Sequence, residues 1–508
     1  MQNYYRTAIL WLSLLPSLLI FWLLMDASNA PLIDWDTASY LYFTSSSGAY
    51  HAPDGTHLLL GGIYYLISAV STTREALIDN TRIAIIFCGI LTILLNHLSG
   101  REIARLHGLS RSSEMFMASL CSLLTALLPA FQYISSTMDD NCFSYPWIAL
   151  AVCLCLRFMR TGRTGLLLIA GCSIIIAILL TLAFAPFGAL IPLAILARGW
   201  WRHTPALTMA LQAAVSGMGS LLFFLLAIAI YDAVHPTPAL ALLLRNYPAI
   251  YHPDASYAYF WEFARVSWTR PLTGCLNLNC SIQEMSQISP QDVDSRPLRT
   301  ASRVLALLPC LAGAYLIYRR DYHKAIFVGF AVALVGLALY FLGFTKSLDA
   351  EERFDILIFL FPLLIYATWS HGLLRYPLLL LIFGTMLLGG RVFLLNQSQT
   401  PRIAEFRNVA AENPTAQRHF FSVAEIPVHE RRIWFTAWAA GLNPVTVHCN
   451  IAPGSHLGQL EAPLLFSPAL AAEITDAQAN QTAYVSPRLS SALSGCQRFE
   501  WPATQGTD

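Results

Sequence analysis

Long apolar runs separated by short polar turns fill most of residues 1–395. A helix that crosses a bilayer needs about 20 mostly apolar residues, and eleven runs meet or approach that length. They cover residues 7–25, 82–98, 113–134, 142–159, 164–182, 186–200, 206–231, 300–318, 324–344, 354–370 and 374–395. We interpret the first run as a retained span rather than a signal peptide, because no clear small-residue cleavage pattern follows it. The pattern therefore predicts an α-helical polytopic membrane protein with about eleven transmembrane helices.

A twelfth apolar run, HLLLGGIYYLISAVS at residues 57–71, is ambiguous by length. Fifteen helical residues reach only about 22 Å, and the pair Gly61-Gly62 weakens a helix further. The basic residues of the short loops decide the question, since cytoplasmic loops are enriched in lysine and arginine. If 57–71 lies flat in the interface, the basic loops fall on the side of the N-terminus: Arg6, Arg101, Arg105, Arg111, Arg157, Arg160, Arg163, Arg198, Arg202, Arg319, Arg320, Lys324 and Arg375.

This assignment predicts a multi-pass protein of the cytoplasmic (inner) membrane, with a cytoplasmic N-terminus and an extracytoplasmic C-terminus. Composition agrees, because 56% of the residues are hydrophobic, 12% are charged and the mean hydropathy is +0.53, whereas soluble domains carry about 25% charge. A net charge of +1 without a basic, aromatic-interleaved stripe argues against a nucleic-acid partner.

Three regions are expected on the outer face: the loops 26–81 and 232–299, and the tail 396–508. The tail has polar and alternating stretches, so we expect a transmembrane domain over 1–395 and a small extracytoplasmic α/β domain over 396–508. Most of the eleven cysteines lie in spans, where a lone thiol acts as a small apolar side chain. The exceptions are Cys275, Cys280, Cys449 and Cys496, which would allow bridges between 275 and 280 and between 449 and 496.

Two pairs of carboxylates fall on this outer face. Asp34 and Asp36 follow the first span, and Asp139 and Asp140 lie at the outer end of the third span. A carboxylate at the membrane surface loses hydration and becomes a stronger base. The simpler explanation is a solvated loop at the interface. The DWD sequence at residues 34–36 also resembles a metal-binding motif of nucleotide-sugar enzymes, but such donors are cytoplasmic, and we expect neither a metal nor another cofactor.

Lys346 and Arg353 occupy a short outer loop that should avoid cations. Their expected partner is an anion, and two sources are open. One is a lipid phosphate, and the other is a structural ion pair with Asp349, Glu351 or Glu352.

The order of these features resembles the GT-C glycosyltransferases, particularly the lipid A aminoarabinose transferases and the protein O-mannosyltransferases. DTASY aligns Asp36 and Tyr40 with the acidic motif of their first outer loop, with Thr37 where the family has a second acid. PDGTHLLLGGIYYL resembles their entry to a flat helix, with His57 near the family's lysine, and STMDDN aligns Asp139. YAYFWEFARVSW, ending near Arg265, and TKSLDAEERF resemble further outer segments.

The resemblance implies a GT-C-like bundle that transfers a sugar from a polyprenyl-phosphate carrier to an envelope lipid, glycan or protein. Asp36 would be the general base, and Asp139 would orient the acceptor or tune Asp36. Lys346, Arg353 or Arg265 would stabilise the departing phosphate, while Asp34, Tyr40, His57 and Asp140 would contact substrate. A transporter or flippase, a polymerase or ligase of lipid-linked glycans, and a non-catalytic membrane component remain as alternatives. A transporter should carry ionisable residues near the bilayer midplane, where the spans have few.

Overall fold

A computed structural model describes the protein over several stretches of the chain. The described residues are 12–27, 59–128, 140–234, 309–345 and 357–380, the strand residues 418–422, 443–448, 464–465 and 484–485, and the single positions 37, 41, 131, 135, 138, 238, 239 and 383. The chain divides into two compact units, which we call the helical unit (1–28, 50–66 and 81–399) and the second unit (29–49, 67–80 and 400–508).

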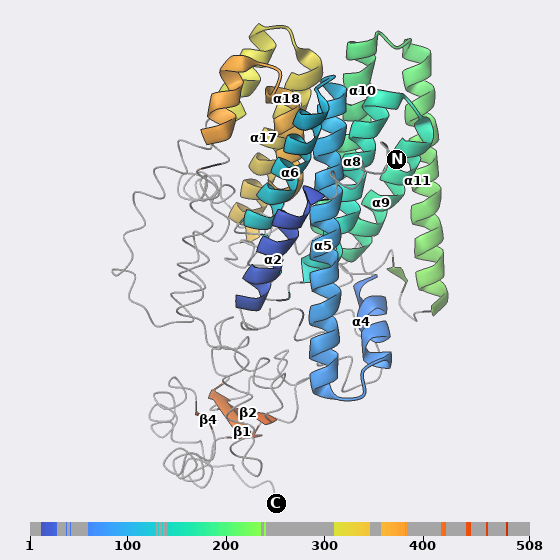
Figure 1. Ribbon diagram of the computed structural model, residues 1–508. Coiled ribbons are helices and arrows are strands. Elements are labelled where there is room, and N and C mark those ends of the chain that lie inside the picture. Colours follow the sequence, from blue (N-terminus) through green and yellow to red (C-terminus); the bar gives the residue numbers. More distant parts are fainter. Residues whose placement is uncertain are drawn as a thin grey trace, which may run out of the picture. The chain divides into compact units, whose positions relative to one another are not determined.

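Helices make up nearly all of the described part of the helical unit (Figure 1). The elements are α2 (Leu15–Ala27), α4 (Leu60–Ala69), α5 (Arg74–Leu106), α6 (Arg111–Leu127), η1 (Asp140–Phe143), α8 (Tyr145–Thr161), α9 (Thr164–Leu180), η2 (Leu182–Ala189), α10 (Leu190–Arg202), α11 (Ala206–Val234), α17 (Tyr322–Thr345) and α18 (Leu357–Thr368). The end of α4 after residue 66 and the start of α5 before residue 81 belong to the second unit. Two further helices cover Pro309–Tyr318 and residues 372–380.

Local sequence explains where several helices begin and end. The side chain of Ser110 accepts a hydrogen bond from the backbone N–H of Ser113 and caps α6. The helix ends at Leu127 because Pro129 forces the residue before it, Leu128, into an extended conformation. Pro146 lies in the first turn of α8, and Gly162 ends that helix in the left-handed conformation, with φ 75°.

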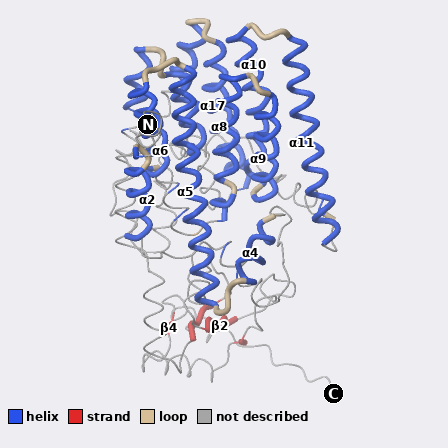
Figure 2. Tube along the Cα trace, turned by 45° about the vertical axis from the view of Figure 1, so that its right-hand side comes forward, coloured by secondary structure: helices blue, strands red, loops and turns tan. Residues whose placement is uncertain are grey.

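Consecutive helices run in alternating directions (Figures 1 and 2). The turns that join α5 to α6, α8 to α9 and α10 to α11 therefore lie at the same end of the helical unit. α8 packs against α9 and α10, α11 packs against α9, and α17 packs against α10 and α18. We call the end with the turns 107–110, 162–163, 203–205, 319–321 and 369–371 the basic end, since its residues include most of the arginines in the predicted cytoplasmic loops. We call the other end, where α8 begins and α9 ends, the opposite end.

Each predicted apolar run contains a described helix, although several boundaries differ. The run 113–134 was expected as one helix, but α6 stops at Leu127 for the reason given above. The run 186–200 begins instead with the 3₁₀ segment η2, which contains Pro186, and α10 starts at Leu190. The apolar run 57–71 forms only α4, whose ten residues span about 15 Å, half the thickness of a bilayer core.

Among the described helices, four are long and apolar enough to cross a bilayer: Ala76–Leu106, Asp140–Thr161, Phe184–Arg202 and Ala206–Ala233. In α11 only 6% of the apolar window is buried inside the protein. Its exposed side chains include Leu207, Leu211, Leu222 and Leu226, a surface that water would not tolerate but hydrocarbon would. The chain is therefore a helical protein of the membrane-embedded class, while the total of eleven spans stays a prediction.

The second unit contains a small parallel sheet with the strand order β3-β2-β1-β4. β1 (Arg418–Ser422) lies between β2 (Asn443–His448) and β4 (Tyr484–Val485), and β3 (Leu464–Leu465) pairs with the outer edge of β2. All three pairings are parallel, and the central one aligns Phe420 with Val445. The strands fall within the predicted tail domain, whose boundary at residue 396 and α/β class remain predictions.

Candidate functional site

Most residues of the predicted outer site lie outside the described part of the chain. They are Asp34, Asp36, Tyr40, His57, Asp139, Arg265, Lys346 and Arg353, together with the four cysteines Cys275, Cys280, Cys449 and Cys496. Asp140 is described, and so is Thr37, the residue in the place of the family's second acid. Thr37 is helical and fully buried in the second unit. The structure thus shows the surroundings of Asp140, whereas the arrangement of the predicted site residues relative to one another stays a prediction.

Asp140 lies in a buried and constrained segment at the opposite end of the helical unit. It is the first residue of η1 and is only 3% exposed. Met138, two residues earlier, is also buried and has a φ of 61°, a left-handed conformation that is uncommon for residues other than glycine. Such constrained backbone occurs often at functional sites, where the surrounding packing maintains it.

The chain that follows Asp140 supplies buried hydroxyl groups and an aromatic cluster. The hydroxyl of Ser144 donates to Oγ1 of Thr181 at 3.1 Å, and both side chains are buried. The ring of Tyr145 is fully buried and packs against three phenylalanines. Its centroid lies 6.1 Å from Phe131, 6.1 Å from Phe184 and 5.6 Å from Phe359. Asp140 is therefore a buried carboxylate in a segment that leads directly into this aromatic cluster, rather than one in an open solvated loop.

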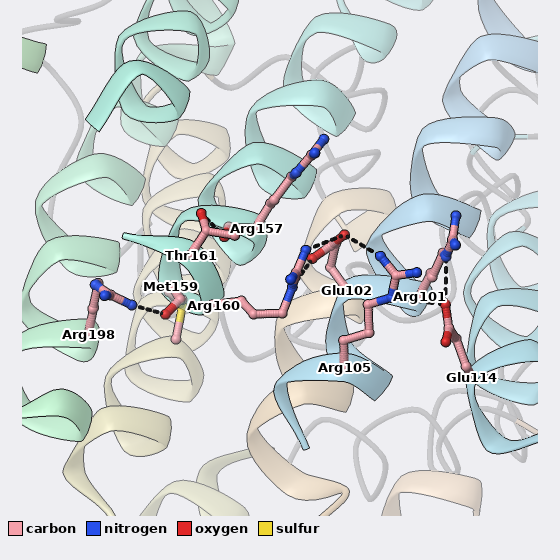
Figure 3. Close-up of polar contacts among 9 residues, drawn as sticks. All are labelled: Arg101, Glu102, Arg105, Glu114, Arg157, Met159, Arg160, Thr161 and Arg198. Carbon is pink, nitrogen blue, oxygen red and sulfur yellow. Dashed lines mark hydrogen bonds and ion pairs between the residues drawn. The ribbon is translucent and has the colours of Figure 1, made fainter. Parts of the chain in front are cut away.

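Ion pairs join the helices at the basic end, where Figure 3 shows their centre. Arg160 of α8 donates to both carboxylate oxygens of Glu102 on α5, at 2.8 Å and 3.3 Å. Arg105 donates to Glu102 at 3.5 Å and to Glu114 of α6 at 3.0 Å, and Arg101 also binds Glu114. The side chain of Glu102 is only 9% exposed, so these ion pairs take the place of water around its carboxylate.

A second polar cluster at this end surrounds Asp321, in the turn before α17. Its carboxylate binds Nδ1 of His323 at 2.8 Å, Nζ of Lys324 at 2.8 Å and Nε2 of His371 at 2.7 Å. Burial alone would raise the pKa of Asp321, but these hydrogen bonds outweigh burial and hold the pKa well below its usual range. The cluster therefore ties the turn 319–321 to the turn 369–371 through a carboxylate that stays ionised.

His107, which follows α5 directly, binds α18 near this second cluster. Its Nε2 lies 2.9 Å from the carbonyl oxygen of Tyr366, so Nε2 carries the proton and donates it. The pKa of His107 is lowered to about 4, mainly by burial; the charges of Lys324 and His323 act in the same direction, while that hydrogen bond and the charge of Asp321 act against it. His107 is accordingly neutral at physiological pH.

A polar seam inside the helices was not predicted from the sequence. Asn96 donates to Thr125 at 2.7 Å, Nδ1 of His97 lies 3.4 Å from the hydroxyl of Ser122, and Ser122 lies 2.8 Å from Ser17. These residues join α5, α6 and α2, and all five are buried. The sequence did indicate it, because His97 lies within the predicted span 82–98, and a histidine inside a span is a candidate functional residue by default.

Among the described residues, no group of three histidine, cysteine, aspartate or glutamate side chains is arranged to hold a metal ion. The seven cysteines described in the helices are free thiols. Comparison with known proteins adds no assignment, because no family model and no curated protein matches the chain.

Proposed function

We propose that the protein is a membrane glycosyltransferase of the GT-C type. In this proposal, a sugar moves from a polyprenyl-phosphate carrier to a lipid, glycan or protein acceptor of the cell envelope, on the extracytoplasmic side of the inner membrane. The observation that carries the proposal is the buried carboxylate of Asp140, next to a left-handed backbone position and an aromatic core, at the end remote from the basic turns. The positive-inside bias assigns the basic end to the cytoplasm and this end to the outside.

The proposed reaction is a single displacement. An acceptor hydroxyl oxygen forms a bond to the anomeric carbon while the bond from that carbon to the carrier phosphate breaks, and the phosphate leaves with the electron pair. Asp36 takes the hydroxyl proton, and Asp139 with Asp140 orients the acceptor. Lys346, Arg353 or Arg265 stabilises the negative charge that develops on the phosphate. One displacement inverts the anomeric centre.

Substitution of the acids tests this assignment in a transfer assay with the purified chain and a radiolabelled polyprenyl-phosphate sugar. We expect Asp36→Asn to abolish transfer and Asp140→Asn to reduce it at least about ten-fold, with folding unchanged. Asp232→Asn is the matched control, since Asp232 is an exposed carboxylate at the same end that accepts the backbone N–H of Ala239 at 2.6 Å. Full activity of Asp36→Asn would exclude Asp36 as the base.

The donor and acceptor require a separate experiment. Mass analysis of envelope glycans and glycoproteins from cells with and without the protein should reveal one missing sugar modification in the deletion. An unchanged profile, together with an inactive purified protein, would contradict the proposal.

The polar seam favours one other function, that of a transporter or lipid flippase. His97 lies fully buried within a candidate span and contacts Ser122, as expected of an ionisable residue that binds a substrate or proton inside a bilayer. A flux assay in proteoliposomes separates the two functions. A transporter would lose flux in His97→Ala but not in Asp36→Asn, whereas for a transferase we expect the reverse pattern in the transfer assay.

A further inference from the structure

The end of α10 and the start of α17 form one continuous surface at the basic end. The rings of Trp200 and Tyr322 lie 6.4 Å apart, and Trp201 stacks on His323 with a centroid distance of 6.3 Å and an angle of 12°. These contacts bring the turn 203–205 beside the turn 319–321. Side chains that are far apart in the sequence therefore share this part of the surface.

Three aromatic side chains in or next to these contacts are exposed, although aromatic rings usually pack inside proteins. Tyr318 is 81% exposed, Trp200 is 50% exposed and Tyr322 is 49% exposed. Apolar side chains continue from them along the helices, since Leu196, one turn before Trp200, and Ile317, next to Tyr318, are exposed as well. Tyrosine and tryptophan beside an apolar surface mark the depth of the lipid headgroups in membrane proteins.

The same surface carries positive charge that no described carboxylate neutralises. Arg202, Arg319 and Arg320 are exposed, and the guanidinium carbon of Arg202 lies 3.9 Å from the ring centroid of Trp201. The adjacent carboxylate of Asp321 is already bound by Lys324 and two histidines. The other carboxylates described at this end, Glu102 and Glu114, bind Arg160, Arg101 and Arg105.

We propose that this surface binds the headgroup phosphates of anionic phospholipids. We call it the headgroup patch, and its residues are Trp200, Arg202, Tyr318, Arg319, Arg320 and Tyr322. The arginines supply the charge complementary to phosphate, and the rings place that charge at headgroup depth. The apolar continuation at Leu196 and Ile317 favours a lipid over a free anion or an acidic protein, because the acyl chains of a lipid cover the apolar side chains while its phosphate binds the arginines. The proposal is independent of sugar transfer.

Native mass spectrometry of the purified full-length chain tests the patch directly. The protein is titrated with phosphatidylglycerol and phosphatidylcholine of equal chain length, and the ratio of bound lipids gives the selectivity. Each basic residue at an anionic membrane surface contributes about a five-fold gain in binding. We therefore expect the wild type to prefer phosphatidylglycerol and the triple variant Arg202→Gln/Arg319→Gln/Arg320→Gln to lose about a hundred-fold in that preference.

The matched control is Arg157→Gln/Arg163→Gln, which removes exposed arginines of the basic end outside the patch. No dashed line joins the guanidinium of Arg157 to the ion-pair network in Figure 3, and this variant should keep the full lipid preference. A triple lysine variant at positions 202, 319 and 320 should keep most of it. If the glutamine triple variant does not fold, Arg319→Gln alone should show about a five-fold loss.

Three results would overturn the proposal. The first is equal binding of the two lipids by the wild type, and the second is an unchanged preference in the folded glutamine variants. The third is displacement of phosphatidylglycerol by an equal concentration of inorganic phosphate or of an acidic peptide, since either would identify the patch as a site for a soluble anion.

Discussion

Ion pairs connect the helices at the basic end, in addition to ring contacts such as that of Trp200 with Tyr322, whereas the described contacts at the opposite end centre on a cluster of aromatic rings. At the basic end, Glu102 and Asp321 each bind side chains from other helices or turns through distances of 2.7–3.3 Å. At the opposite end, the rings of Tyr145, Phe184, Phe187 and Phe359 pack within 5.6–6.1 Å of one another. One end thus depends on matched charges and short turns, and the other on apolar packing next to a buried carboxylate.

This difference is the one we expect if the proposed transfer reaction takes place at the opposite end. Ion pairs at the boundary of a membrane hold turns in place where water and headgroups also reach. A rigid aromatic core, by contrast, positions polar groups without competing for their hydrogen bonds. Variants that weaken either end separately can therefore test the comparison.

The largest loss of stability should come from the aromatic core. Tyr145→Ala removes a fully buried ring, and we expect a decrease of about 4 kcal/mol in the free energy of unfolding. Phe87→Ala is the control, since Phe87 is an aromatic residue of α5 that is 59% exposed, and its loss should stay below about 1 kcal/mol. Thermal and denaturant unfolding in detergent provide the measurement, and similar losses in both variants would contradict the description of this core.

The next largest effect should come from breaking the central ion pair at the basic end. Glu102→Leu leaves Arg160 without its carboxylate, and we expect a loss of about 3 kcal/mol, because Arg160 is partly exposed. The double variant Glu102→Leu/Arg160→Met removes both charges and should recover most of that loss. A double variant no more stable than Glu102→Leu would show that the uncompensated charge of Arg160 is not the cause of the loss.

Close packing between α5 and α6 gives a third test. At Gly100, an added methyl group would lie 2.8 Å from Cα of Ala118 and closer still to the carbonyl oxygen of Met117. Gly100→Ala should therefore destabilise the protein by about 2 kcal/mol. Gly165→Ala, where nothing lies within 4 Å of the new methyl group, should stabilise α9 by about 0.5 kcal/mol. In the same unfolding assay, we expect the free energy of unfolding to decrease in Gly100→Ala and to increase in Gly165→Ala.

An effect similar in size to that of Gly100→Ala concerns pH at the basic end. His107 has a pKa of about 4 in the folded protein and about 6.5 when unfolded, so only the unfolded chain gains a proton between these values. Stability should accordingly fall as the pH decreases from 6.5 towards 4, by about 2 kcal/mol at pH 5. His107→Gln should remove this part of the pH dependence, and a variant with the same slope as the wild type would exclude His107 as its source.

The apolar runs of the sequence predicted where helices form, because the length and composition of each segment are local properties. Helix ends were predicted less well, as α6 and α10 show. At α6 the proline at position 129 was a readable stop signal, whereas the 3₁₀ form of η2 depends on how the residues around Pro186 pack. Boundaries of this kind require knowledge of the neighbouring helices.

The candidate site was predictable in composition but not in arrangement. The outer acids, Asp140 among them, could be selected from their position after apolar runs. That Asp140 is buried depends on the backbone turn at Met138 and on neighbouring residues, which the sequence does not reveal. Likewise, Glu102 and Arg160 are 58 residues apart, and only the packing of α5 near α8 makes them partners.

The low internal burial of α11 has a consequence for how this helix tolerates sequence change. Its free energy depends mainly on transfer into hydrocarbon, since α9 and α10 supply most of its protein contacts. Exchanges among leucine, isoleucine, valine and methionine on its outer faces should therefore be nearly neutral, and drift at these positions should be fast. A single charged residue midway along the same faces would instead impair insertion by the translocon, by about 3 kcal/mol.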